Sequence, residues 1–484
     1  MTGGLTTAVL PIALGGVLVA AISYRDGAIG SLHGRTRGRP RRGARWARRS
    51  DLKALLVDAD RPPPGRVVLG TLSGSGRNRG IATEVAQSVV VVGPTQSGKT
   101  TSLAVPAILN WQGPVLAASV KSDLLRDTYR HRFARGQVWC VDPTGSTGMA
   151  PSQWSPLTDC GHWPHALRVA AELSESAKAD GPSVDGDFWQ ATAANMLAPL
   201  FFAAARGHKS MADVIRWVDT QEMAEVGDIL EEAAVPEALH AARATWCRDD
   251  RTRSSVSTTA ETILAPFAHA SARPTDWFEP ERLLGGDHTV YLCAPAHDQR
   301  RLRGYFTALT QQILSYAFTV ATRAHKALDP PLLVVLDEAA HIAPLAELDG
   351  LAATCASHGI QLVTVWQDVA QVRARYGARA PTVLNNHRAK LFLPGIADPD
   401  TLDYASRLIG DEEATVPSFT RDPRGGRSTT STTGPRRLLP PEELRCLPLG
   451  RAVLVYGILP PVQLRLRQWW ASSGRSRSTA VRGS

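Results

Sequence analysis

Short runs of apolar residues that end on a polar side chain recur along the chain. Runs of this kind, rich in valine and leucine, are typical of strands buried on both faces of a parallel sheet. The predicted strands are 88–92, 115–120, 137–141, 289–293, 332–336, 361–365, 390–393 and 452–455. A helix is predicted at 123–133, between the second and third of these strands. The pattern therefore predicts an α/β fold with a mostly parallel sheet.

Between about residues 160 and 280 the strand signals nearly vanish, and apolar positions recur at helical spacing. The predicted helices are 165–178, 188–205, 211–218, 221–234 and 252–268. A long block of one structural class between two α/β stretches predicts an inserted all-helical domain. We place this domain at 159–282, and the two parts of the α/β domain at 61–158 and 283–471.

A glycine-rich loop follows the strand at 88–92 and fits the pattern G-x-x-x-x-G-K-[ST]. The residues predicted to bind a nucleotide are Gly93, Pro94, Thr95, Gln96, Ser97, Gly98, Lys99, Thr100 and Thr101. Backbone N–H groups in such a loop can surround an anion, and the N-terminus of the following helix adds about half a positive charge. Lys99 is expected to reach the β- and γ-phosphates, and the Thr100 hydroxyl to bind Mg²⁺.

The helix after this loop is expected to continue to about Trp111, with Pro106 inside it. Proline in a helix interior costs about 3 kcal/mol, because it removes a hydrogen bond and crowds the preceding turn. Nothing in the sequence compensates for this cost.

The strand at 332–336 delivers Asp337 and Glu338 to its C-terminal end, where α/β sheets bind ligands. Asp337 suits Mg²⁺, through water, and Glu338 is a candidate general base that polarises the attacking water. An acidic pair at an ordinary strand-to-helix turn would look the same, but the phosphate loop favours the catalytic interpretation. Gln367, after the strand at 361–365, is a candidate to orient water at the γ-phosphate, although a lone glutamine is more often a surface amide.

The net charge of +9 is unevenly distributed. Residues 25–50 contain nine arginines against one acid, and residues 421–484 contain twelve against three, whereas residues 51–420 carry a net charge of −8. The pI of 9.5 therefore reflects two flanks and does not by itself indicate nucleic-acid binding. The six cysteines show no zinc-ligand spacing and are interpreted as reduced.

Residues 5–24 form a stretch of twenty residues without a charge, long enough to span a bilayer. A signal peptide is the alternative, but residues 1–4 lack the expected Lys or Arg. We predict a transmembrane anchor at 1–24 and, by the positive-inside rule, a single-pass protein of the inner or plasma membrane with residues 25–484 in the cytoplasm. Residues 25–60 are then a basic juxtamembrane linker, 421–438 a mobile low-complexity loop, and 472–484 a disordered basic tail.

The basic run at 35–49 suits either DNA phosphates or anionic lipid head groups, and a topogenic role beside the membrane is favoured.

Taken together, these motifs resemble the TraG/TraD-type coupling proteins of conjugation and type IV secretion, relatives of FtsK- and HerA-type translocases. Besides the phosphate loop, the resemblance rests on segments in the same order at 119–124 (SVKSDL), 142–145 (DPTG), 154–157 (WSPL), 188–189 (FW), 336–340 (LDEAA), 366–371 (WQDVAQ), 376–377 (YG) and 438–444 (LLPPEEL). It implies a RecA-like P-loop NTPase that uses ATP and Mg²⁺ and is interrupted by an all-α domain. It also implies a membrane-anchored homo-hexamer that receives single-stranded DNA with its relaxase, or a secreted protein, and passes it to type IV secretion channel proteins.

One position departs from the family pattern. Some relatives carry an arginine finger eleven residues before the glutamine, and this chain has Ala356 there. Arg373, Arg375, Arg388 and Arg407 are the alternatives for a charge donated to a neighbouring subunit, and Arg388 is preferred.

Three functions stay open at this point. The first is an ATP-driven coupling motor that moves DNA. The second is a substrate-docking receptor in which nucleotide binding is mainly structural. The third is an FtsK-like pump for double-stranded DNA that needs no secretion channel.

Overall fold

The computed structural model describes residues 43–72, 79–177, 184–268, 277–295, 297–421 and 427–471. Residues 43–484 form one compact unit. The predicted anchor at 1–24, most of the basic linker and the tail at 472–484 lie outside the described residues. Within the described ranges, no helix is both long enough and apolar enough to cross a membrane.

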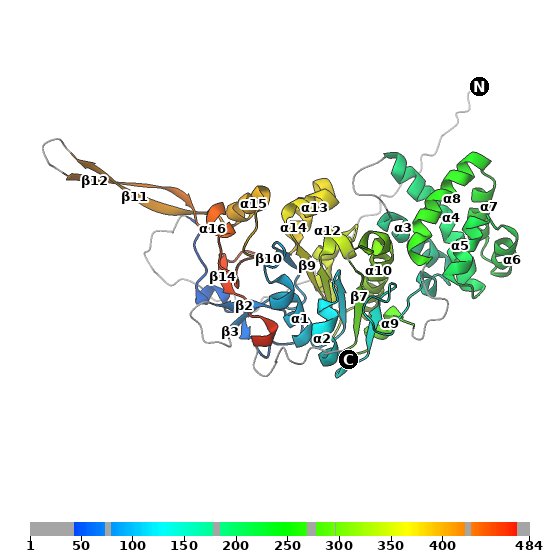
Figure 1. The fold of residues 1–484 in the computed structure, drawn as a ribbon, viewed down its shortest axis with the longest axis horizontal. Helices are drawn as coiled ribbons and strands as arrows, with labels where there is room; N and C mark the ends of the chain where they lie inside the picture. The colour runs from blue at the N-terminus through cyan, green and yellow to red at the C-terminus, as the bar shows by residue number, and fades with distance from the viewer. Residues whose placement is uncertain are drawn as a thin grey trace, which may run out of the picture. The chain divides into compact units, whose positions relative to one another are not determined.

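A twelve-stranded sheet forms the centre of this unit (Figure 1). Its order is β1-β3-β2-β14-β13-β10-β4-β9-β8-β5-β7-β6. The strands are β1 (Leu56–Asp58), β2 (Val68–Leu72), β3 (Arg79–Ala82), β4 (Val89–Val92), β5 (Val115–Ser119), β6 (Val138–Val141), β7 (Thr289–Cys293), β8 (Leu332–Asp337), β9 (Ile360–Trp366), β10 (Ala389–Phe392), β13 (Arg451–Tyr456) and β14 (Val462–Arg465). Neighbours from β10 to β6 are parallel, and those from β10 to β1 are antiparallel. The predicted α/β class with a mostly parallel sheet is confirmed.

Both faces of the sheet are buried, which explains why its strands are continuously apolar. Val90 and Val92 belong to one hydrophobic cluster, whereas Val89 and Val91 belong to the other. Helices α1 (Val105–Asn110) and α2 (Asp123–Phe133) contribute to the second cluster. The helices that contribute to the first include α10 (Gln299–Ala324), α12 (Leu348–Thr354), α13 (Val369–Tyr376), α14 (Ala380–Asn386) and α15 (Pro399–Ile409).

The segment between β6 and β7 is helical, as the sequence pattern predicts (Figure 1). Its helices are α3 (Trp163–Ser176), α4 (Val184–Arg206), α5 (Met211–Asp219), α6 (Ala224–Glu232), α7 (Pro236–Trp246) and α8 (Asp250–Leu264). The predicted set lacked α7. The apolar side chains of these helices continue into the same hydrophobic cluster as one face of the sheet, so the insertion has no separate core.

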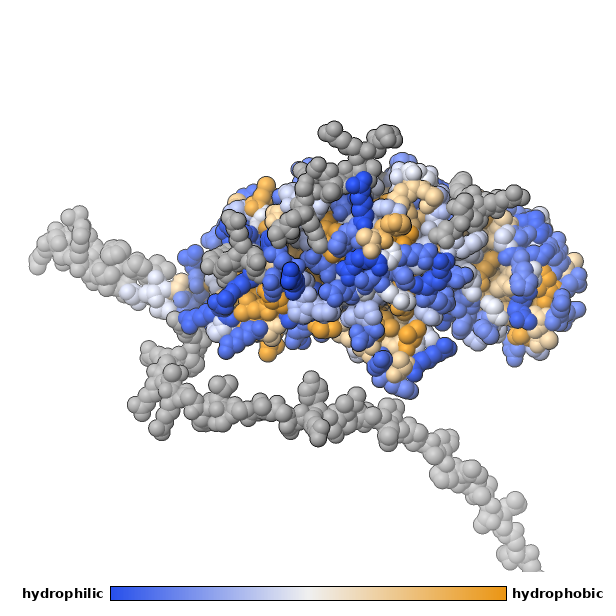
Figure 2. Space-filling view, turned by 90° about the horizontal axis from the view of Figure 1, so that it is seen from below, coloured by the Kyte–Doolittle hydropathy of each residue, from blue (hydrophilic) through white to orange (hydrophobic). Residues whose placement is uncertain are grey.

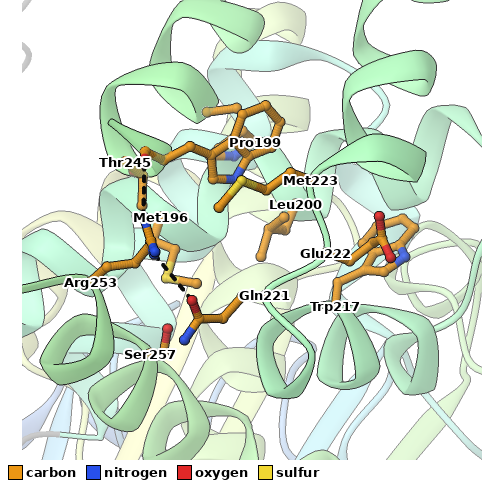
Figure 3. A pocket seen from close by; sticks show the side chains of 12 residues that line it. Met196, Pro199, Leu200, Trp217, Gln221, Glu222, Met223, Thr245, Arg253 and Ser257 are labelled. Atoms are coloured by element: carbon orange, nitrogen blue, oxygen red, sulfur yellow. Dashed lines mark hydrogen bonds between the residues drawn. The ribbon is translucent and has the colours of Figure 1, made fainter. Parts of the chain in front are cut away.

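Figure 3 shows a cavity inside this insertion, lined by side chains that include Met196, Trp217 and Arg253. Arg253 Nε donates to Gln221 Oε1 over 3.1 Å. The cavity measures about 10 Å³, close to the least space that one water molecule needs. It is therefore a packing gap between helices and not a substrate site.

The predicted mobile loop at 421–438 is wrong for most of its length. β11 (Asp411–Arg421) and β12 (Arg427–Arg437) pair in continuous antiparallel register and form a hairpin that projects away from the sheet near α16 (Pro441–Arg445) (Figure 1). The low-complexity composition misled the prediction, because β12 is rich in threonine, which favours strands. Ala44 N–H donates to Asp411 O at the base of this hairpin.

The strain expected from Pro106 is relieved by the turn that precedes it. Residues Thr100–Ala104 form a π-helical turn, in which Val105 N–H donates to Thr100 O, five residues back. Helix α1 then begins at Val105, so that Pro106 stands in its first turn. A proline costs little there, because the N–H groups of a first helical turn have no partner within their own helix.

The surface in Figure 2 is mainly hydrophilic, and hydrophobic side chains appear on it in separate groups. The large apolar side chains that are most exposed, among them Phe133, Phe188, Leu449 and Ile458, come from different elements of the fold. Single exposed apolar residues of this kind are normal for a folded protein.

Candidate nucleotide site

The phosphate loop (residues 93–100) leaves the carboxyl end of β4 at the centre of the parallel part of the sheet. Gly93 N–H donates to Trp366 O at the end of β9 over 3.1 Å, which ties the loop to the neighbouring strand. Gln96 and Gly98 have φ values of +64° and +92°. A Cβ on Gly93 would lie 2.8 Å from both Leu393 Cβ and Ser97 Oγ, so this position requires glycine.

Lys99 is buried and folds back onto the loop that carries it. Its Nζ donates to Gly93 O and Pro94 O, both over 2.6 Å. Burial lowers the pKa of Lys99, and the nearby charges of Asp337 and Glu338 oppose this shift. An ammonium group held by two neutral carbonyl oxygens can exchange them for phosphate oxygens, which carry charge and bind it more strongly.

Thr100 and Asp337 meet directly, although they are 237 positions apart in the sequence. Thr100 Oγ1 donates to Asp337 Oδ2 over 2.9 Å. Asp337 is only 5% exposed, and its other oxygen, Oδ1, is buried without a hydrogen-bond partner. Burial raises the pKa of Asp337 to about 6. A buried carboxylate with an unused oxygen next to a threonine hydroxyl is a set of donors that suits Mg²⁺.

Glu338 follows Asp337 and begins the short helix α11 (Ala339–Ile342). Its φ of +63° and ψ of +54° lie in the left-handed region, which residues with a side chain rarely adopt. Strain of this kind is concentrated at functional sites. Within the described part of the chain its partly exposed carboxylate has no hydrogen bond or ion pair, so it is available to a water molecule or a ligand.

Gln367 follows β9, the strand that lies between β4 and β8. The register pairs Val92 with Trp366 on one side of β9 and Leu336 with Thr364 on the other. Gln367 therefore stands between the phosphate loop and the acidic pair. Its backbone N–H donates to Gln371 Oε1 over 3.0 Å.

Arg388 does not join these residues. It precedes β10, whose parallel register with β4 pairs Ala389 with Val89, so Arg388 lies at the amino edge of the sheet, opposite the phosphate loop. Its Nη2 is 3.1 Å from Glu84 Oε2, and its guanidinium lies over the Tyr456 ring. The same edge has an open cavity of about 1020 Å³, lined by residues that include Arg388, Lys390 and Ala356.

Lys121 lies in the segment at 119–124, and no role for it was predicted from the sequence. Lys121 comes two residues after β5, and the β5–β8 register pairs Ser119 with Asp337. Its charge lowers the pKa of Lys99 and opposes the rise in the pKa of Asp337. The signal that could have identified it is a lysine directly after a strand that ends at the ligand-binding edge.

The family model described as "Type IV secretory system Conjugative DNA transfer" matches residues 45–480. A conjugal transfer protein TraG of Escherichia coli is 24% identical over 464 residues, which cover 84% of this chain and 71% of that protein. Protein VirD4 of Rhizobium radiobacter is 23% identical over 404 residues, which cover 79% of this chain and 57% of that protein.

Solved structures of the plasmid coupling protein TrwB have the same fold. The structure of TrwB in complex with ADP and Mg²⁺ is 19% identical, with a TM-score of 0.65, and the match covers 90% of this chain and 97% of that chain. The family match extends over nine-tenths of the sequence and includes the phosphate loop, the acidic pair and the helical insertion. The chain therefore belongs to the type IV secretory system conjugative DNA transfer family, the family of the coupling proteins.

Proposed function

We propose that this chain is an ATP-hydrolysing coupling protein that drives DNA through a type IV secretion channel. The observation that carries the proposal is the hydrogen bond between Thr100 and Asp337. It joins the phosphate loop, which includes Lys99, and the acidic pair, which includes Glu338, into one site. TrwB has been solved in complex with ADP and Mg²⁺ and with a non-hydrolysable ATP analogue, which supports the same ligands here.

The residues present fit ATP and Mg²⁺. The phosphate loop offers backbone N–H groups and Lys99, and the unpartnered Oδ1 of Asp337 offers an acceptor for a metal-bound water beside the Thr100 hydroxyl. Thr100 and Asp337 would hold the metal ion, Asp337 through water. When bound, Mg²⁺ would neutralise phosphate charge and favour attack on the γ-phosphate.

The protein groups divide the remaining tasks. Lys99 releases Gly93 O and Pro94 O and binds phosphate oxygens. Glu338 accepts a proton from the attacking water, and its left-handed backbone fixes the direction in which the carboxylate leaves β8. Gln367 orients that water from the strand between the two motifs.

Two substitutions separate binding from hydrolysis. Lys99→Ala is expected to lose both nucleotide affinity and ATPase activity. Glu338→Gln is expected to keep nucleotide affinity within about threefold and to lose ATPase activity by about 10²-fold or more, since general-base catalysis contributes about 10²–10⁴-fold. Unchanged turnover in the purified Glu338→Gln protein would refute the assignment.

The same variants test the docking-receptor alternative. If nucleotide binding were mainly structural, Glu338→Gln would still support DNA transfer between cells. A motor requires hydrolysis, so we expect transfer to be lost while the amount of protein is unchanged. Translocation assays on single-stranded and duplex DNA then distinguish the coupling motor, which we expect to prefer single strands, from an FtsK-like pump.

We propose further that the chain works as a homo-hexameric ring in which Arg388 reaches the nucleotide of a neighbouring subunit. Its position at the amino edge supports this, because in a head-to-tail ring that edge of one copy can face the phosphate site of the next. Arg388 lines the same cavity as Ala356, the position of the finger in some relatives. Mixing the Arg388→Ala and Glu338→Gln proteins tests this proposal. In a mixed ring, some sites combine the intact Glu338 of one subunit with the intact Arg388 of its neighbour, and these sites are expected to restore part of the ATPase activity. Absence of any restoration in mixed rings contradicts it.

The remaining proposals concern place and partners. Residues 5–24 anchor the protein in the inner membrane with the ATPase domain in the cytoplasm, where it meets a relaxase–DNA complex and the channel proteins. The uncharged stretch at 5–24 and the nine arginines that follow it in residues 25–50 are what supports the anchor and its orientation. Membrane fractionation of the full chain and of a chain lacking residues 1–24 tests the anchor, and release of the shortened protein into the soluble fraction is the expected result.

A further inference from the structure

Lys121 is an exposed cation placed beside the buried carboxylate of the nucleotide site. The β5–β8 register sets Ser119 opposite Asp337, and the chain leaves the sheet directly afterwards. Lys121 N–H donates to Ser119 Oγ over 3.2 Å, which holds the turn at the carboxyl edge. The strand order is β4-β9-β8-β5, so Lys99 and Lys121 approach Asp337 from opposite sides of β8.

The ammonium group of Lys121 has no hydrogen bond or ion pair within the described part of the chain. The nearest acid in sequence, Asp123, lies 3.3 Å from Arg126. Lys121 also precedes the N-terminus of α2, where a positive charge is unfavourable. Lys121 is close enough to Lys99 for its charge to lower the pKa of Lys99. Asp337 and Glu338 offset part of the repulsion between the two lysines and the helix N-terminus, and a multivalent anion at this edge would offset more of it.

We propose that Lys121 is a second lysine of the nucleotide site and binds the terminal phosphate of the triphosphate. This inference rests on the proposed function. The phosphate loop at β4 would hold the inner phosphates, and Thr100 and Asp337 would hold Mg²⁺, which would neutralise charge at the terminal end of the triphosphate. A cation on the far side of Asp337 from the loop therefore meets the last phosphate, and Lys121 would distinguish a triphosphate from a diphosphate.

Equilibrium binding tests this without relying on turnover. The affinities of the full-length chain for fluorescent ADP and for a fluorescent non-hydrolysable ATP analogue are measured with Mg²⁺. We expect Lys121→Ala to weaken binding of the analogue about tenfold, equal to about 1.4 kcal/mol, and binding of ADP by less than about twofold. Lys121→Arg, which keeps the charge, is expected to recover most of the loss.

The matched control is Lys326→Ala, which removes another exposed lysine, just after α10 and at the far edge of the sheet. It is expected to change neither affinity. Equal affinities of wild type and Lys121→Ala for the analogue would overturn the inference, and so would equal losses for ADP and the analogue. If DNA affinity fell while both nucleotide affinities stayed the same, Lys121 would be a DNA contact and the inference would be wrong.

Lys99→Ala separates this inference from the proposed function. If Lys99→Ala loses nucleotide affinity and Lys121→Ala does not, only the role of Lys121 fails. If Lys99→Ala also keeps full affinity, the nucleotide site itself is wrong. The melting temperatures of the apo Lys121 variants are expected to equal that of the wild type, because Lys121 is exposed, and this shows that a change in their affinity is not a loss of folding.

Discussion

Replacing Asp337 with asparagine should stabilise the protein in the absence of nucleotide while it removes the proposed metal ligand. Asp337 is 5% exposed, its Oδ1 has no hydrogen-bond partner, and burial raises its pKa from 3.8 to about 6. A carboxyl group with a higher pKa in the folded state binds its proton more tightly there than in the unfolded chain. Ionisation of Asp337 therefore costs stability as the pH rises from about 4 to 6, and the cost is complete above about pH 7.

The size of the effect follows from the two pKa values. Their difference of about 2 units corresponds to about 3 kcal/mol at about 1.4 kcal/mol per unit. An unfolding entropy of about 2.1 cal/mol/K per residue amounts to roughly 1 kcal/mol/K for a chain of this length, so 3 kcal/mol corresponds to roughly 3 °C in melting temperature. Asparagine keeps the shape and the acceptor for Thr100 Oγ1 without the charge.

Thermal unfolding of the apo proteins at several pH values measures this. Asp337→Asn is expected to melt roughly 3 °C above wild type at pH 7.5, and the difference should disappear near pH 4, where wild-type Asp337 is protonated. Mg²⁺ with an ATP analogue should raise the melting temperature of wild type but much less that of the variant. A variant that is less stable than wild type at pH 7.5, or a difference that does not change with pH, would refute the reasoning.

Three further predictions concern packing and buried polar groups. Gly93→Ala should lower nucleotide affinity and cost about 1–3 kcal/mol of stability, because its Cβ would crowd Leu393 and Ser97. The control Gly350→Ala, whose Cβ meets open space in helix α12, should leave the affinity unchanged and raise stability by up to about 1 kcal/mol. Arg132→Met should lower the free energy of unfolding, measured in denaturant titrations, by about 3–5 kcal/mol. The reason is that its fully buried guanidinium donates to Trp111 O, Gly113 O and Thr289 Oγ1. The control Arg130→Met, on the exposed side of the same helix, should cost under about 0.5 kcal/mol. Burial lowers the pKa of His387 from 6.5 to about 4, so the stability that depends on its neutral form should be lost as the pH falls from 6.5 to 4. His387→Gln should reduce the dependence of the free energy of unfolding on pH in this range, and an unchanged dependence would contradict the prediction.

The parts of the fold that could be predicted are those that the chain encodes locally. Each central strand carries its own apolar run, and the predicted strand at 289–293 coincides with β7. Helix α2 coincides with its predicted range of 123–133 for the same reason. The phosphate loop is equally local, because its glycines and Lys99 act through neighbouring backbone atoms.

Other elements were missed for different reasons. Helix α10 was not predicted, although Leu302, Phe306, Leu309 and Ile313 repeat at helical spacing, so its signal was present. The β11–β12 hairpin was overlooked because its serines and threonines were interpreted from composition and not from pairing. The π-helical turn before Pro106 could not be foreseen, since an extra residue in a helical turn leaves no mark on the apolar pattern.

The phosphate loop and the acidic pair lie close together because of the order of the strands in the sheet. Neither of the two sequence motifs encodes that order. Because β9 lies between β4 and β8, the residue that follows it stands between the phosphate loop and the acidic pair. Gln367, which looks like an ordinary glutamine in the sequence, is thereby placed between the two halves of the candidate site. Gln367 N–H is bound by Gln371 on α13, whose Val372 and Tyr376 pack into the hydrophobic cluster that continues through α10 into the helical insertion. Gln367 is therefore joined, through Gln371 and helix α13, to the hydrophobic cluster that the sheet shares with the insertion.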